Sequence, residues 1–320
     1  MLSSETLRSA SDTLRALALD ERLKRRALEI PGVAQAARRA AARYIAGDAA
    51  ADAIALLGAN AERGHLGSVE LVGESVRERD TAERETRTLI GLAEGLAARE
   101  VPATVCFDLS HVGSLISPRL GWENASRIAQ AAREAGTSTL ISAEGSDRTD
   151  LVLELWERLS LDFPETGITL QARLHRTPRD LVRVMRRPGP VRLVKGAFLE
   201  PEDVAFPRDS AGMLAAYRDA VALLARAGHP VRVATHDAAL VDVLRTELGE
   251  DLRGEHVEFE TLQGLGTELL DGLAEDGFVT REYVVYGPEW WLYVLNRIAE
   301  HPERAILALA DLGLAGRAGG

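Results

Sequence analysis

The sequence almost entirely lacks cysteine. Cys106 is the single cysteine among 320 residues, so the chain has no internal disulfide framework of the kind that holds small secreted domains together. Its first residues also lack the apolar core of a signal peptide, and we therefore expect a cytoplasmic protein. Cys106 lies in the apolar run ATVCFDL, and we interpret its thiol as an inert part of the core rather than a nucleophile.

Long apolar runs and positive charge are lacking as well. No stretch approaches the roughly 20 consecutive apolar residues that a membrane-spanning helix needs. The formal net charge of −11 disfavours binding to the phosphate backbone of nucleic acids. The hydrophobic content of 46% is ample for a core. Integral membrane and nucleic-acid roles are therefore disfavoured, and the oligomeric state stays open.

Two common cofactor motifs are also missing. The seven histidines contain neither an HxxxH nor an HxH pair, so we expect no protein-bound metal. The segment GLGTEL at 264–269 begins like a dinucleotide-binding GxGxxG loop but lacks its third glycine. Any cofactor is then held in another way.

What is present is a change of pattern along the chain. Apolar periodicity predicts helices at 11–28, 33–45 and 49–60, with no strand among them. Short runs that favour β-structure then alternate with amphipathic helical segments. The predicted strands are 66–73, 103–109, 138–143, 167–174, 191–196, 230–235, 256–260 and 282–287, and the helices between and after them are 80–99, 123–135, 147–159, 179–186, 211–227, 238–248, 268–275 and 289–300.

Eight strand–helix units predict an α/β fold of the (β/α)8 barrel type rather than an open doubly wound sheet, which usually has fewer strands. No Pro- or Gly-rich linker divides the chain. We therefore predict an N-terminal helical extension at 1–64 and one catalytic barrel domain at 65–320. In such barrels the chemistry takes place at the C-terminal ends of the strands.

Polar residues gather at these predicted strand ends. A single Glu, His or Thr there is usually a helix cap or a solvated loop residue, and Thr235 and Asp237 have the simple alternative of capping the helix that follows. The accumulation at one end of the strands is what indicates a site. Its members include Asp108, His111, Glu144, Gln171, Arg173, Arg192, Lys195, Thr235, His236, Gln263, Tyr283 and Tyr286.

Five ordered motifs give the chain a family resemblance. LQARL at 170–174, RLVKGAF at 192–198, ATHD at 234–237, EFETLQG at 258–264 and YVVYGPEWWLYVLNRIAE at 283–300 resemble LQAYL, RLVKGAY, ATHD, EFQMLYG and a final tyrosine-rich strand and helix ending in RRxxE. These are the motifs of proline dehydrogenase, and the chain resembles the short, single-function bacterial members.

The resemblance implies a flavoenzyme with noncovalent FAD across the barrel mouth. It implies transfer of a hydride to the flavin from the carbon beside a secondary amine nitrogen, so that L-proline becomes 1-pyrroline-5-carboxylate. The electrons would pass to a quinone, which implies transient membrane contact. A peripheral position at the inner face of the cell membrane is thus an alternative to a purely cytoplasmic one.

The resemblance also assigns cofactor-binding residues. Arg192 matches the arginine that contacts the flavin, where a cation stabilises the negative charge of the reduced ring. Lys195, the second candidate catalytic residue, matches with Gly196 and Ala197 a backbone bend that lets the ring approach. The other assigned residues are Gln171 for the isoalloxazine, Thr235 and His236 for the phosphate and adenosine, and Val194 and Glu300.

Several residues at positions that match the family's substrate pocket depart from the family pattern. Tyr283, Tyr293 and Arg297 match substrate-pocket residues, but Asn296 stands where the family has a second arginine for the substrate carboxylate. Losing one charge-assisted hydrogen bond costs roughly 1.5–3 kcal/mol. Phe198 and Arg173 replace tyrosines, and Arg173 is a candidate for a relocated cation in the substrate pocket.

A further pair of changes leaves the substrate open. Asp108 and Ser142 stand where the family has an ion-paired lysine and aspartate. The residues that match flavin contacts are retained, whereas several that match substrate contacts are changed. The substrate is therefore either proline or another compound: a modified proline, another secondary amine, a hydrazine-like compound, or a proline unit within something larger. Two other readings remain: a Schiff-base enzyme that uses Lys195, and a noncatalytic binding protein.

Overall fold

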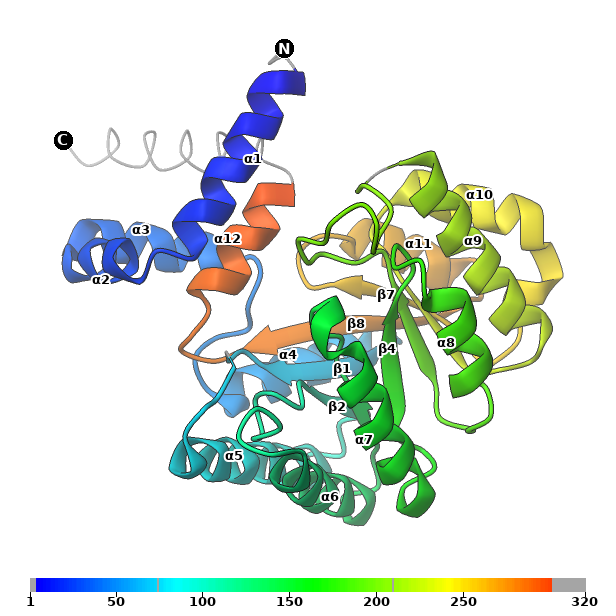
Figure 1. Ribbon diagram of the computed structural model, residues 1–320, viewed down its shortest axis with the longest axis horizontal. Helices are drawn as coiled ribbons and strands as arrows, with labels where there is room; N and C mark the ends of the chain where they lie inside the picture. Colours follow the sequence, from blue (N-terminus) through cyan, green and yellow to red (C-terminus); the bar gives the residue numbers. More distant parts are fainter. Residues whose placement is uncertain (1–3, 74, 209, 301–320) are drawn as a thin grey trace.

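The computed structural model describes residues 4–300 except 74 and 209, and its centre is a closed parallel barrel (Figure 1). Each strand pairs with the next along the chain, and β8 returns to pair with β1. The predicted barrel is confirmed, and every predicted strand is present within a few residues. The strands are β1 (Leu66–Leu71), β2 (Ala103–Phe107), β3 (Thr139–Ile141), β4 (Gly167–Gln171), β5 (Val191–Val194), β6 (Val231–Ala234), β7 (Val257–Leu262) and β8 (Val279–Tyr286).

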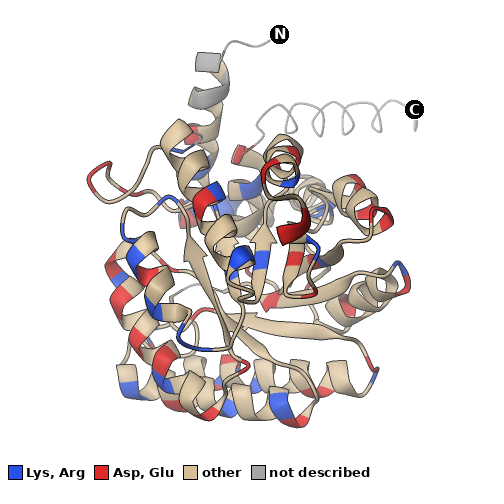
Figure 2. Ribbon diagram, turned by 90° about the vertical axis from the view of Figure 1, so that its right-hand side faces the viewer, with Lys and Arg blue, Asp and Glu red and all other residues tan. Residues whose placement is uncertain are grey.

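Helices cover the outside of the barrel, as the periodicity predicts. Charged residues of both signs lie along these outer helices (Figure 2), while their apolar faces pack on the strands. The elements are α5 (Arg79–Ala97), α6 (Pro118–Glu134), η1 (Ser146–Arg148), α7 (Thr149–Asp162), α8 (Thr177–Val184), α9 (Ala211–Arg226), α10 (Ala238–Leu248), η2 (Gly249–Leu252), α11 (Thr267–Glu275) and α12 (Trp291–Glu300).

The N-terminal helices differ from the prediction in one place. The single helix predicted at 11–28 is wrong, because the chain forms α1 (Ser4–Ala18) and α2 (Glu21–Glu29) instead. Asp20 causes the break: its backbone is extended, and its carboxylate accepts hydrogen bonds from the backbone N–H groups of Arg22 and Leu23. This is an N-cap, a role for which aspartate is strongly preferred. The predictions at 33–45 and 49–60 correspond to α3 (Pro31–Ala41) and α4 (Ala50–Glu62).

The first four helices pack in two different places. Helix α4 contributes Ala53, Ile54 and Leu57 to the apolar core of the barrel. Helix α1 lies beside α12, away from the other outer helices (Figure 1), and Ser11 Oγ donates a 2.7 Å hydrogen bond to the Ala299 carbonyl. The proposed boundary between residues 64 and 65 stays a prediction, and residues 301–320 of the predicted barrel domain lie outside the described residues.

Most of the core is one continuous apolar cluster between the barrel and its helices. A second, smaller cluster joins Trp290, Trp291 and Val294 to Val285 of β8 and to Tyr44. This smaller cluster fixes α12 over the end of β8. No helix within the described part of the chain has both the length and the apolar composition of a membrane span.

The Cys106 thiol generates the first prediction. It is fully buried in β2, and burial raises its pKa above the ordinary value, which keeps the reactive thiolate scarce. We expect the native protein to react with a thiol reagent such as dithionitrobenzoate at least a hundredfold more slowly than the denatured chain, which should release one equivalent. Equally fast reaction of both forms would contradict this interpretation.

Candidate active site

Arg192 lies inside the barrel and is held by Glu260. Arg192 Nε and Nη2 donate hydrogen bonds of 2.6 and 2.8 Å to the two carboxylate oxygens of Glu260, and the two side chains are 4% and 2% exposed. Burial alone raises the pKa of Glu260, but the charge and hydrogen bonds of Arg192 more than offset it and leave that pKa below the ordinary value. The two residues therefore form a buried ion pair.

Tyr283 of β8 connects this pair to the strand ends. The Arg192 guanidinium carbon lies 4.5 Å from the centroid of the Tyr283 ring, which is a cation–π distance. Burial, and then the charge of Glu70, raise the pKa of the Tyr283 phenol well above its ordinary value. The phenol keeps its proton and donates a hydrogen bond to the Glu70 carboxylate, which also accepts a 2.6 Å hydrogen bond from Ser142 Oγ.

Asp108 lies near two further carboxylates. Burial, and then the charges of Glu70 and Glu144, raise its pKa well above the ordinary value, so Asp108 holds its proton to a higher pH than an exposed aspartate. Glu144 accepts hydrogen bonds from the Ser110 backbone N–H and from Arg148. This side of the barrel mouth is thus acidic, and the hydroxyl of Ser142 binds Glu70.

The predicted backbone bend follows β5. Gly196 has a φ of +109°, a conformation that side-chain-bearing residues rarely adopt. A Cβ at Gly196 would meet Arg173 at 2.8 Å and Gln171 Oε1 at 3.0 Å. Arg173 donates hydrogen bonds to the backbone carbonyls of Phe198 and Phe206, so it supports the loop after β5.

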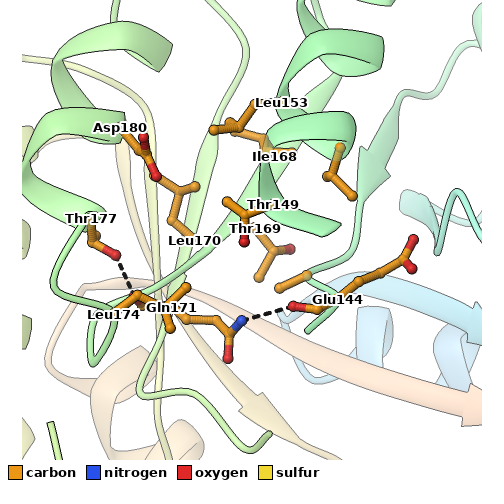
Figure 3. Close-up of a pocket in the computed structure, with 12 residues that line it drawn as sticks. Glu144, Thr149, Leu153, Ile168, Thr169, Leu170, Gln171, Leu174, Thr177 and Asp180 are labelled. Atoms are coloured by element: carbon orange, nitrogen blue, oxygen red, sulfur yellow. Dashed lines mark hydrogen bonds between the residues drawn. The ribbon is translucent and has the colours of Figure 1, made fainter. Parts of the chain in front are cut away.

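Gln171, at the end of β4, has an unpaired buried oxygen. Its Nε2 donates a 2.9 Å hydrogen bond to the Glu144 carbonyl. Its Oε1 is buried without a hydrogen-bond partner, although the residue is only 3% exposed. Figure 3 shows this side chain at the edge of a pocket bordered by Leu153 and Ile168, with its oxygen directed away from them. An orphaned buried acceptor of this kind is uncommon and fits a group that donates a hydrogen bond.

Lys195 and Thr235 connect the ends of β5 and β6. Lys195 Nζ lies 2.6 Å from an oxygen of Asp237, so its ammonium group is ion-paired. Asp237 also caps α10 by accepting a hydrogen bond from the Leu240 backbone N–H, which confirms its interpretation as a helix cap. Thr235 Oγ1 accepts a hydrogen bond from the Asp237 backbone N–H.

Helix α12 brings three predicted residues together over the barrel mouth. Arg297 forms a 2.9 Å ion pair with Glu300, and its guanidinium carbon lies 5.5 Å from the centroid of the Tyr293 ring. The charge of Glu70 is among the influences that raise the pKa of Tyr293, after burial. Tyr293 and Tyr283 both pack against the second apolar cluster, and the influence of the Glu70 charge on both phenols places them near the acidic side of the mouth. Asn296 is half-buried on the same helix.

The remaining predicted residues lie at the rim. Val194 and His236 are half-buried, and Ala197 and Phe198 are exposed. The sequence interpretation missed Glu70 and Glu260, which partner Tyr283 and Arg192. Their signal is the alternation of strand residues: Ser68 and Glu70, and likewise Glu258 and Glu260, are spaced by two and so point to one face.

A second group of charges lies deeper in the barrel. Glu258 contacts Arg281 at 2.6 Å and Arg232 at 3.1 Å. Burial raises the pKa of Glu258, but the two arginines more than offset it and leave that pKa below the ordinary value. Across residues 4–300, apart from 74 and 209, no three His, Cys, Asp or Glu side chains gather as a set of metal ligands.

Comparison with known proteins identifies the family. The family model described as proline dehydrogenase matches residues 53–297. The chain belongs to the proline dehydrogenase family. It is 33% identical over 294 residues to the proline dehydrogenase of Deinococcus radiodurans. This alignment covers 89% of this chain and 94% of that protein. It is 27% identical to proline dehydrogenase 1 of Bacillus subtilis strain 168, with 86% and 91% coverage.

Solved structures agree on the fold. Proline utilization A from Bdellovibrio bacteriovorus superposes with a TM-score of 0.76 at 19% identity, and the match covers 92% of this chain and 36% of that one. The chain therefore spans about a third of that protein. Proline dehydrogenases are flavin-dependent oxidoreductases that act on a CH–NH bond. Two features here fit a flavin: the orphaned Gln171 oxygen and the Gly196 bend, where a Cβ would intrude.

Gly196 generates a prediction with a matched control. Gly196→Ala places a Cβ against Gln171 and Arg173 at a positive φ, whereas Gly228 has a φ of +65° and open space around it. Both substitutions carry a backbone penalty of about 1–2 kcal/mol, and both should lower the Tm. We expect only Gly196→Ala to weaken flavin binding, by at least tenfold in a fluorescence titration. Equal flavin affinity in the two variants would contradict the role of this bend.

Acid stability gives another prediction. The pKa of Glu258 and of Glu260 is depressed in the folded protein, so the stability that these carboxylates contribute is present above their unfolded pKa of about 4.3. It is lost as the pH falls through the lower folded values. We expect the Tm, followed by circular dichroism, to fall as the pH drops below about 4.3, and to fall less steeply in Glu258→Gln. A Glu258→Gln variant as acid-sensitive as the wild type would refute this account.

Proposed function

We propose that this protein oxidises L-proline to 1-pyrroline-5-carboxylate with noncovalently bound FAD. The observation that carries the proposal is the similarity to the Deinococcus radiodurans proline dehydrogenase, which extends over 89% of this chain and 94% of that protein. The polar groups at the ends of the barrel strands support it, because they include a buried cation, an orphaned amide oxygen and two tyrosines.

The proposed cofactor site consists of residues at the ends of β4, β5 and β6. Gln171 Oε1 would accept a hydrogen bond from the isoalloxazine, and the bend at Gly196 would leave room for the ring. Val194, Lys195 and Ala197 border this bend, Thr235 and His236 would face the phosphate and adenosine, and Glu300 would border the site from α12. When bound, the flavin supplies the acceptor for a hydride.

The proposed catalytic step needs few protein groups. Oxidation removes a hydride from the carbon beside nitrogen and a proton from the nitrogen, and a C=N bond forms. The chain's contribution is to hold the amine in a site that excludes water, which favours its neutral form. Arg192 would supply a positive charge to a flavin bound at the mouth, where it would favour the negatively charged reduced form. We include Tyr283, Tyr293 and Arg297 in the substrate pocket.

A second candidate is the same chemistry on another secondary amine or a hydrazine-like compound. Two features favour it: Asn296 is uncharged, and Asp108 lies beside Glu70 and Glu144. The Glu70 carboxylate, which is held by the hydroxyls of Ser142 and Tyr283, would repel a substrate carboxylate. Arg173, the candidate for a relocated cation, directs its guanidinium to the carbonyls of Phe198 and Phe206 in the loop after β5.

The Schiff-base alternative has less support. A lysine that attacks a carbonyl needs a neutral amine, which an apolar pocket or a neighbouring cation provides. Lys195 instead lies 2.6 Å from an oxygen of Asp237, so its nitrogen is already engaged with a carboxylate.

The direct test is an assay of the purified protein loaded with FAD, with L-proline as substrate and an artificial electron acceptor. We expect a product that gives the yellow adduct of 1-pyrroline-5-carboxylate with o-aminobenzaldehyde. Turnover of another cyclic secondary amine with none of proline would replace the first candidate by the second. A protein that binds no FAD would overturn both.

Asn296→Arg generates a prediction about substrate recognition. The added guanidinium would supply a second charge-assisted hydrogen bond to the carboxylate of proline, worth roughly 1.5–3 kcal/mol. We expect the KM for proline to fall about ten- to a hundredfold with little change in kcat. Asn296→Gln, which adds length without charge, serves as the control. An unchanged KM in Asn296→Arg would show that the proline carboxylate does not bind beside α12.

A further inference from the structure

We propose that Glu260 is a positioning residue that sets how much positive charge Arg192 presents to the flavin, and thereby sets the flavin's reduction potential. This inference rests on the proposed function, because it concerns the same cofactor site. It adds a residue to the site and a property that the proposed reaction depends on.

The contact between Glu260 and Arg192 is specific. Both carboxylate oxygens accept hydrogen bonds from the guanidinium, which is the fork geometry that fixes an arginine most firmly. The carboxylate is itself oriented by Ser68, whose Oγ donates a 2.5 Å hydrogen bond to Glu260 Oε1. On another side, Arg192 Nη2 lies 3.3 Å from Cys106 Sγ.

Burial strengthens the electrostatic effect of the Glu260 carboxylate on Arg192. Arg192 and Glu260 are 3% and 2% exposed, and water screens a charge little at such sites. A neutral ion pair stabilises added negative charge much less than a bare guanidinium does. Two-electron reduction adds negative charge to a flavin, so Glu260 should make the reduction potential more negative than Arg192 alone would make it.

The barrel offers a matched control two residues away. Glu258 points into the barrel from the same strand and pairs with arginines, but its partners are Arg281 and Arg232. Removing the charge of either glutamate breaks a buried ion pair and lowers stability. Only Glu260→Gln changes the electrostatic partner of Arg192.

The experiment compares the midpoint potentials of FAD-loaded wild type, Glu260→Gln and Glu258→Gln in an anaerobic spectroscopic titration. We expect Glu260→Gln to raise the ratio of reduced to oxidised flavin at a fixed potential at least tenfold, a positive shift of about 30 mV for a two-electron couple. Glu258→Gln should stay at the wild-type potential. Equal shifts in the two variants, or no shift in Glu260→Gln, would overturn the inference.

Ser68→Ala tests the inference if Glu260→Gln does not fold. This variant removes the hydroxyl that donates a hydrogen bond to Glu260 and partly neutralises its negative charge. The reduction potential of the flavin should therefore become more negative. An unchanged or more positive potential would overturn the inference. The experiment distinguishes failure of the proposed function from failure of this inference. A wild type that binds no FAD overturns the proposed function and this inference together, whereas a proline-reducible wild type with an unchanged Glu260→Gln potential overturns this inference alone.

Discussion

The pairing of β1 with β8 is the constraint on which the site depends. Six residue pairs join the strands, from Leu66 opposite Arg281 to Leu71 opposite Tyr286. This closure brings the start of the barrel sequence beside its end, so Glu70 meets Tyr283 across 213 positions of the chain. It also brings α12 over the mouth, since β8 leads directly into that helix. Without this closure the predicted substrate residues would have no barrel end to face.

Closure also forces charged side chains into a space with little water. The barrel interior contains Arg192, Arg232 and Arg281 opposite Glu258 and Glu260. Buried charges are tolerated when they are paired and hydrogen-bonded, and each arginine here has a carboxylate partner. This polar interior differs from the branched aliphatic layers that usually fill such barrels. The charge that a cofactor at the mouth would experience therefore depends on how these arginines and glutamates are paired.

The fold was largely predictable because each strand–helix unit has its own local signal. Buried runs such as ATVCF and amphipathic segments such as the one forming α9 identify strands and helices without knowledge of their neighbours. The break at Asp20 was missed because apolar periodicity continues across it. The partners of the site residues were not predictable in the same way, because Glu260 and Arg192 are 68 positions apart. Alternation indicates that Glu260 points inward, but only the closed barrel determines which cation it meets.

In the proposed function, a flavin bound at this barrel mouth accepts electrons from proline. The most direct test of this proposal is the absorption spectrum of purified, FAD-loaded wild-type protein during anaerobic addition of L-proline. We expect flavin bands that bleach as proline is added and return when an electron acceptor is supplied. Flavin bands that persist at saturating proline would rule out proline as the electron donor.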